Sequence, residues 1–369
     1  MAADDAHSEV LDLFLELAAI PSPSGEEHVV AERVTAYLRD LALKPEVDDA
    51  GNVLARMEAS DANGGTPIFL CAHMDTVPVS GPIEPVVEDG VVRNGADTIL
   101  GADDKAAVAV LLQAARKVLS EGHPHAGIEL LFTVREETGL QGAKAFDHTR
   151  LGARTGYVYD YSGRVGDVVI AAPSGRQIDV TFRGRPAHAG INPEEGRSAV
   201  FAAAKAIADL RLGRIDDETT ANVGRIEGGA ARNVVPELCT VTAEARSRDE
   251  RKLADLVAEM LDAFTFAGGV GECEVATKVE ESYRGYRLRP DDPSVRLAFT
   301  ALESAGFSPR PVEVGGGADA NVFNERGLAC VNLANGMAHV HTADEEIAVD
   351  DLDGMLRVTL ELVEAARSA

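Results

Sequence analysis

The sequence predicts an α/β protein in which a domain with a mostly parallel central sheet is interrupted by a smaller α+β domain. Helix and strand patterns alternate from the start, which favours parallel strands joined by helical crossovers. The chain has 369 residues, which is too long for one ordinary core. This alternation of helix and strand patterns changes near residue 173 and resumes near residue 284. We therefore expect one domain from residues 1–173 and 284–369, and an inserted domain from residues 174–283.

The elements of the first domain follow from local patterns. Residues 8–20 carry apolar side chains at helical spacing, and a second helix is predicted after Ser24, where Glu27 three positions later completes a capping-box pattern. A third helix is expected over residues 103–119. Four strand-like runs are present, at residues 52–57, 68–72, 127–134 and 156–159.

The inserted domain and the end of the chain complete the predicted order. Between residues 174 and 283 we expect a strand, a helix over 194–212, two strands, a helix over 249–264 and a last strand. The alternating pattern of the first domain then resumes with a helix, two strands and a closing helix, at residues 292–305, 310–314, 328–333 and from 350 onward.

Composition is that of a folded globular protein, with 45% hydrophobic and 26% charged residues. No apolar run reaches the roughly 18 residues of a membrane span, and the start "MAADDAHSEV" is acidic where a secretory signal would be basic and then apolar. We expect a cytoplasmic protein. The four cysteines form no CxxC pair, which indicates small core residues; they are Cys71, Cys239, Cys273 and Cys330.

The charge balance is strongly acidic. The chain has 61 acidic and 35 basic residues, a formal charge of −26, and the acids are spread along its whole length. This argues against a nucleic-acid partner. Because arginine carries most of the positive charge, the composition resembles that of proteins soluble in concentrated salt, and we hypothesise a halophilic source. A merely acidic cytosolic protein is the alternative.

Polar residues stand just beyond several of the predicted strands and in a segment near the C-terminus. They are His73 and Asp75, Asp103 and Asp104, Glu136 and Glu137, Asp160, and His339 with His341. In open α/β sheets ligands bind in the crevice beyond the carboxyl ends of the strands, so these side chains can share one pocket. Each alone is more simply read as a surface, capping or hydrogen-bonded residue. Together they suit a divalent metal such as zinc, manganese or cobalt.

The order and spacing of seven motifs resemble a known family. They are "AHMDTVP", "LGADDKAA", "REETGLQGA", "YDYSG", "RPAHAGINPEEGRSA", "GGAARNVVPE" and "HVHTADEEI". The chain resembles, over nearly its whole length, the peptidase T-like branch of the co-catalytic zinc metallopeptidases, which are related to glutamate carboxypeptidases and aminoacylases. The resemblance implies that the inserted domain is a ferredoxin-like lid through which a homodimer forms.

The resemblance also implies a ligand set for two metal ions. His73 and Asp160 would hold one ion, Glu137 and His341 the other, and Asp103 would bridge them. Asp75 would accept a hydrogen bond from the far nitrogen of His73 and make that ligand more basic.

The adjacent glutamates receive different roles. Because successive strand residues point to opposite faces, two neighbouring side chains cannot easily bind one metal in the same way. The resemblance implies that Glu137 is a ligand and that Glu136 is the general base, which takes a proton from a metal-activated water and passes it to the leaving amine.

The resemblance gives the inserted domain and a late glycine-rich loop a part in binding substrate. His188 would reach the active site across a dimer interface, while Asn233 and Arg246 would contact the carboxylate or backbone of the substrate. Gly316, in "VGGGADANVF", would line the pocket, although a simple turn explains these glycines equally well.

These expectations lead to a tripeptide aminopeptidase as the function. Asp rather than Glu at position 160 favours the aminopeptidase side of the family. The alternatives are a carboxypeptidase or N-acyl amino acid amidohydrolase on the same scaffold, a metal-dependent binding protein without catalysis, and an acidic structural protein that holds no stoichiometric metal.

Overall fold

A computed structural model describes residues 8–60 and 64–369. The acidic start of the chain, residues 1–7, on which part of the cytoplasmic expectation depends, lies outside these ranges. The described chain divides into two compact units. The first comprises residues up to 170, 287–313 and 318–369, and the second comprises 171–286 with 314–317. Gly316, which the sequence assigned to the first domain, therefore belongs to the second unit.

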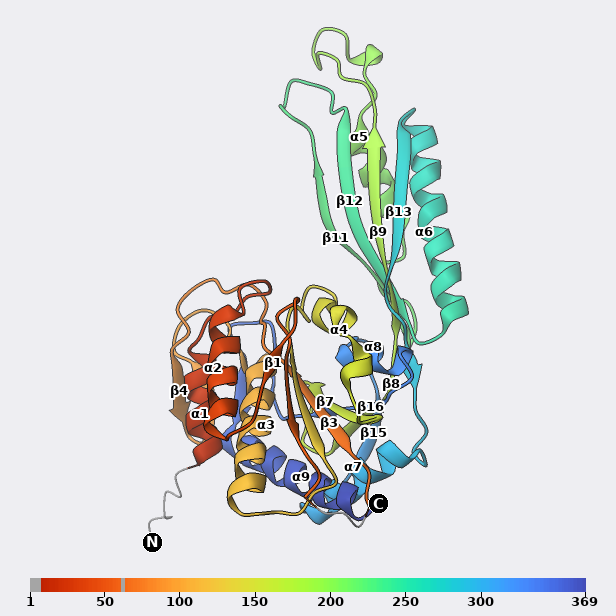
Figure 1. Cartoon of the computed structure of the whole chain (residues 1–369). Helices are drawn as coiled ribbons and strands as arrows, with labels where there is room; N and C mark the ends of the chain where they lie inside the picture. Colours follow the sequence, from red (N-terminus) through yellow and green to blue (C-terminus); the bar gives the residue numbers. More distant parts are fainter. Residues whose placement is uncertain (1–7, 61–63) are drawn as a thin grey trace. The chain divides into compact units, whose positions relative to one another are not determined.

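The first unit is built around a mixed sheet with a parallel centre (Figure 1). Its strands run β1-β2-β6-β3-β7-β16-β8-β14, with β15 beside β8, and the neighbours β6, β3, β7 and β16 are parallel. A separate sheet has the order β17-β5-β4. The elements are α1 (Glu9–Ala18), α2 (His28–Asp40), β1 (Glu46–Val47), β2 (Val53–Met57), β3 (Ile68–His73), β4 (Pro85–Glu88), β5 (Val91–Asn94), α3 (Ala102–Ser120), β6 (Ile128–Thr133), α4 (Gln141–Ala145), β7 (Thr155–Tyr161), β8 (Asp167–Ala172), β14 (Tyr286–Arg287), α7 (Pro293–Ser304), β15 (Arg310–Glu313), α8 (Asp319–Glu325), β16 (Ala329–Ala334), β17 (Glu346–Ala348) and α9 (Val349–Arg367).

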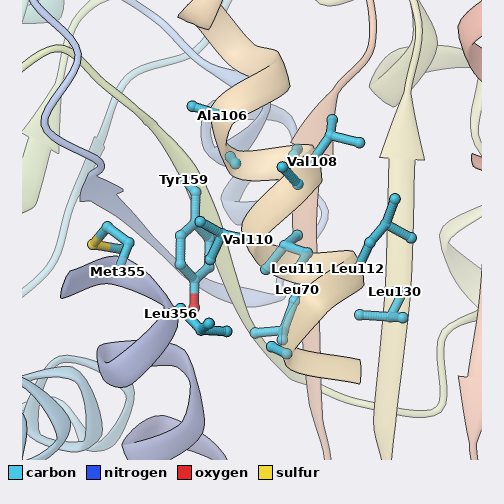
Figure 2. Close-up of a cluster of buried hydrophobic side chains, with 14 of the residues drawn as sticks. Leu70, Ala106, Val108, Val110, Leu111, Leu112, Leu130, Tyr159, Met355 and Leu356 are labelled. Atoms are coloured by element: carbon cyan, nitrogen blue, oxygen red, sulfur yellow. The ribbon is translucent and has the colours of Figure 1, made fainter. Parts of the chain in front are cut away.

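The core of the first unit forms where α3 packs against this sheet. Figure 2 shows side chains of α3 beside Leu70 of β3, Leu130 of β6, Tyr159 of β7 and Met355 of α9, all of them at most 1% exposed. Burying a large apolar side chain stabilises the fold by roughly 1.5–3 kcal/mol. The helix that carries Asp103 in its first turn is therefore anchored along most of its length.

The predicted capping box of α2 is wrong. The helix begins at His28, and its N-cap residue Glu27 makes no side-chain capping bond. The carboxylate of Glu27 instead accepts hydrogen bonds from the backbone N–H groups of Gly25 and Arg135, and the Ser24 hydroxyl donates to Asp75. These residues serve contacts with distant segments, which a local pattern does not reveal.

The second unit is an antiparallel sheet with two helices. Its strands run β10-β11-β12-β9-β13. Apart from the two-residue edge strand β10, the order along the chain is β-α-β-β-α-β, with β9 and β12 in the centre; this is a ferredoxin-like fold and confirms the predicted fold class. Helix α5 begins later than predicted because Ser198 caps it by accepting from the Phe201 N–H. The elements are β9 (Ser174–Arg183), α5 (Ala199–Asp209), β10 (Gly213–Arg214), β11 (Thr219–Gly228), β12 (Leu238–Ser247), α6 (Glu250–Val270) and β13 (Glu274–Tyr283).

None of the helices in the described ranges has the length and apolar content needed to cross a membrane.

Candidate metal centre

Strand ends and loops of the first unit bring the predicted ligands together. His73 is the last residue of β3, Asp160 lies near the end of β7, and Asp103 lies in the first turn of α3. Glu137 follows β6, and His341 lies in the loop before β17. Because β6, β3 and β7 are adjacent and parallel, their carboxyl ends meet at one edge of the sheet.

Ligand-type atoms form two groups that share one carboxylate. His73, Asp103 and Asp160 offer atoms within 4.8 Å of one another, and so do Asp103, Glu137 and His341. A third group of the same kind consists of His73, Glu136 and Glu137. The geometry thus allows two cations with Asp103 between them, and it places Glu136 beside the same cluster.

The two oxygens of Asp103 face different histidines. Oδ1 lies 3.0 Å from His73 Nε2, and Oδ2 lies 3.2 Å from His341 Nε2. His341 Nε2 also lies 2.9 Å from Glu137 Oε1. Asp104, joined to Asp103 by a cis peptide bond, instead accepts hydrogen bonds from the His73 N–H and the Asn335 amide. A carboxylate that turns one oxygen to each side has the arrangement of a bridging ligand.

The contacts of Asp75 differ from those expected. The carboxylate lies 3.5 Å from His73 Nδ1, whereas its own backbone oxygen lies 2.9 Å from that nitrogen. Its Oδ1 accepts from the Glu136 N–H at 2.9 Å, and its Oδ2 accepts from the Glu137 N–H at 3.1 Å and from the Ser24 hydroxyl at 2.6 Å. Asp75 therefore faces His73 with both its backbone oxygen and its carboxylate, the backbone oxygen being nearer, and its carboxylate also holds the two glutamates in place.

The argument from strand alternation does not apply to the glutamates. Strand β6 ends at Thr133, so Glu136 and Glu137 lie in the turn that follows it. Arg135, directly before them, has a left-handed backbone with φ 52°. It is this turn, and not the pleat of a strand, that separates the two side chains. Glu136 is buried at 8% exposure.

The electrostatics of the cluster fit divalent cations. Burial and the charge of Asp103 raise the pKa of Asp160 well above its usual range, and burial and the charge of Asp160 do the same for Glu136. Hydrogen bonds to Asp103 and Glu137 raise the pKa of His341 to about 10. Both carboxyl groups favour the protonated form because they are buried and lie close to other carboxylates. Cations held by imidazole and carboxylate ligands would offset the repulsion between these carboxylates.

Sequence reasoning gave no structural role to two further buried charges. Glu345 is 1% exposed and accepts hydrogen bonds from three backbone N–H groups around Asp103. Asp319, at the start of α8, accepts from the Thr133 hydroxyl at 2.6 Å, while its Oδ1 has no hydrogen-bond partner among the described residues. Burial raises the pKa of Asp319 to about 6. In the sequence, the signals for these two buried residues were the first Glu of "HVHTADEEI" and the single Asp of "GGGADANVF".

The predicted substrate-binding residues all lie in the second unit. His188 is exposed, and the backbone N–H of Ala189 next to it donates to the Asn233 carbonyl oxygen at 3.0 Å. Arg246, on β12, forms an ion pair with Glu244 at 2.9 Å. A Cβ added at Gly316 would meet no atom within 4 Å, so packing does not require glycine there.

Comparisons with known proteins assign the family. The crystal structure of aminopeptidase PepT from Bacillus cereus ATCC 10987 superposes with a TM-score of 0.85 at 38% identity, covering 97% of this chain and 98% of that one. The protein belongs to the peptidase T-like metallopeptidases. This confirms the family that the motifs indicated, and the protein is an enzyme of the metallopeptidase class.

Other proteins match over similar lengths. A tripeptidase structure from Staphylococcus aureus has a TM-score of 0.90 at 33% identity and covers 98% of both chains. Uncharacterized protein YqjE of Bacillus subtilis is 37% identical and covers 97% of this chain and 98% of its own length. The model of peptidase family M28 matches residues 52–168, and that of the peptidase dimerisation domain matches residues 174–271.

Proposed function

We propose that this peptidase T-like enzyme releases the N-terminal residue of tripeptides with the help of two metal ions. The observation that carries the proposal is the pair of ligand groups sharing Asp103, with Glu136 buried beside them. The solved relatives described as an aminopeptidase and a tripeptidase support the choice of substrate. A carboxypeptidase or N-acyl amino acid amidohydrolase would use the same centre with a different leaving amine.

Five residues are proposed to hold the ions, with zinc as the first choice and cobalt or manganese as alternatives. They are His73 and Asp160 for one ion, Glu137 and His341 for the other, and Asp103 for both. When bound, the two ions supply Lewis acidity for the peptide carbonyl and make a water molecule more acidic.

Glu136 is proposed as the general base. Its backbone N–H is fixed by Asp75 Oδ1, so the carboxylate stays beside the ligand cluster without being needed in either ligand group. It takes a proton from the attacking water and returns it to the nitrogen of the leaving amine. Asp75 supports this step indirectly, because it holds the turn that presents both glutamates.

The second unit is proposed to form a homodimer interface and to contribute substrate contacts through His188, Asn233, Arg246 and Gly316. The match to the peptidase dimerisation domain supports this assembly. Light scattering at micromolar concentration should give twice the chain mass. A monomer with full activity would contradict the proposed role of His188 across the interface.

The proposed location is the cytoplasm, and the proposed source is halophilic. The acidic residues spread over the chain, with a net charge of −26, support the second point because salt screens their mutual repulsion. If activity and the free energy of unfolding do not rise in molar potassium chloride, the halophilic proposal is wrong.

The deciding experiment is a comparison of substrates on the purified, metal-loaded enzyme. A tripeptide library should be tested beside N-acetyl amino acids, with the released residue identified by mass spectrometry. We expect release of the N-terminal residue from tripeptides and much slower cleavage of the N-acetyl compounds. Release from the carboxyl end, or a preference for the N-acetyl compounds, would favour the alternative functions.

A further inference from the structure

A cavity in the first unit lies next to the turn that presents Glu136. Its volume is about 710 Å³, within the range of roughly 300–1,000 Å³ typical of small-molecule sites. Its walls come from α2, the loop before α2, the segment joining β1 to β2, and the pair Val134 and Arg135. None of these lining residues is a proposed metal ligand.

The cavity offers positive charges that the fold does not use. Arg39 and Arg135 both line it and are exposed, and neither guanidinium forms a hydrogen bond or ion pair with another described residue. Guanidinium groups favour carboxylates because their parallel N–H donors match the two oxygens. The imidazole of His28 also lies on this wall.

The same cavity offers negative charge. Glu32 lines it one turn after His28, and its exposed carboxylate has no hydrogen-bond or ion-pair partner among the described residues. Glu27 is buried at 6% exposure and uses its Oε1 to accept from Gly25 and Arg135. With acids and bases both present, a simple anion does not complement the site.

The remaining wall is apolar. Ala31, Val47 and Val134 contribute to the lining, and Val47 is 55% exposed although it is a large hydrophobic residue. A ligand that covers this surface would gain from its burial.

We propose that this cavity binds the zwitterion of a free amino acid or short peptide. The ligand's carboxylate lies against Arg39, its ammonium against Glu32, seven residues earlier on the same face of α2, and its side chain against Val47. The assignment follows from the charges and walls of the cavity and does not depend on the proposed peptidase reaction. Because Val134 and Arg135 line the cavity directly before Glu136, an occupant lies next to the turn that presents Glu136.

The test is a titration of the metal-loaded enzyme, with its valine methyl groups labelled with ¹³C, using L-leucine. We expect saturable shifts of the Val47 and Val134 methyl resonances. Leucine analogues lacking the ammonium (4-methylpentanoate) or the carboxylate (3-methylbutylamine) should bind at least tenfold more weakly. If 4-methylpentanoate or acetate binds as tightly as L-leucine, the site is a simple anion site and the proposal is wrong.

Variants separate this cavity from the metal centre. R39Q and E32Q should each weaken the Val47 shift by tenfold or more, and circular dichroism should show an intact fold because both side chains are exposed. The matched control is R296Q, on α7, whose exposed guanidinium also has no partner among the described residues. Equal L-leucine affinity in R39Q, E32Q and R296Q would overturn the proposal.

Discussion

Glu345 and Asp103 are joined through the main chain. Glu345 Oε1 accepts from the backbone N–H of Asp103 at 2.9 Å, and Oε2 accepts from those of Leu100 and Gly101 at 2.9 and 2.8 Å. Glu345 follows His341 by four residues, so its carboxylate connects the loop of one proposed ligand to the turn that presents the bridging one. The side chain of Lys105 is fully buried; burial lowers its pKa to about 7, and the charge of Glu345 opposes that shift.

Replacing Glu345 by Gln should lower the affinity for metal. The amide has one acceptor oxygen, so at least one buried N–H around Asp103 loses its partner and the bridging carboxylate moves. Residues that support metal ligands in this way typically change affinity by roughly 10–100-fold. Calorimetric titration of the metal-free protein with zinc measures the effect. The control E346Q alters the neighbouring carboxylate, which pairs with Arg93 and contacts no proposed ligand. If E345Q and E346Q bound zinc with equal affinity, the hydrogen bonds of Glu345 would not be what positions Asp103.

Replacing Glu136 by Gln should stop hydrolysis and leave the metal in place. General-base catalysis contributes about 10²–10⁴-fold to rates, and the amide cannot accept the water proton. We expect kcat to fall by at least about 10²-fold, with metal content, measured by mass spectrometry, equal to that of the wild type. Unchanged turnover would contradict the mechanism, and loss of metal would show that Glu136 is itself a ligand.

Replacing Asp319 by Asn should stabilise the metal-free protein at neutral pH. Burial raises the pKa of Asp319 from 3.8 to about 6, so the folded state favours the protonated form. The protonated carboxyl of Asp319 contributes its full stabilisation below pH 3.8, its ordinary pKa, and this stabilisation is lost as pH rises through about 6. At roughly 1.4 kcal/mol per pKa unit, the charged group costs about 3 kcal/mol above pH 6.

Urea unfolding in EDTA between pH 4 and 8 measures this effect. D319N should exceed the wild type in unfolding free energy at pH 8 and approach it near pH 4. D40N, which changes an exposed acid on α2, should show no such trend. A constant difference between D319N and the wild type across the pH range would mean that Asp319 does not titrate as its burial requires.

Local patterns were sufficient to predict the framework of the site. The strand predicted over residues 127–134 is observed as Ile128–Thr133, and the one over 68–72 as Ile68–His73. Continuous apolar runs mark strands buried on both faces, and their ends mark the edge where ligands gather. This is why the polar residues at the strand ends could be gathered as candidates before their distances were known, whereas the choice of the five ligands among them came from the resemblance to the family.

The supporting contacts could not be predicted because they join distant segments. Ser24 reaches Asp75, Glu27 reaches Arg135, and Glu345 reaches residues near Asp103. Each of these side chains has a plausible local role, such as helix capping for Ser24 and Glu27, and only the tertiary structure decides against it. Roles that depend on how the second unit is placed, such as that of His188, are beyond local patterns for the same reason.

Replacing Gly142 by Ala should destabilise the turn that carries the glutamates. A Cβ at this position would lie 2.2 Å from the Val134 oxygen and 2.6 Å from Asn52 Oδ1. Those atoms belong to a network in which Gly142 donates to Val134 and accepts from the Asn52 amide, so the turn cannot yield without losing hydrogen bonds. Overpacking of this kind typically costs about 1–3 kcal/mol. Urea unfolding should show that loss, and activity should fall with it because Glu136 follows Val134 by two residues.

G81A is the control in the same unit, since its Cβ would meet only the Thr98 side chain, at 3.9 Å. Equal stability of G142A and G81A would mean that the turn accommodates a side chain and does not fix Glu136.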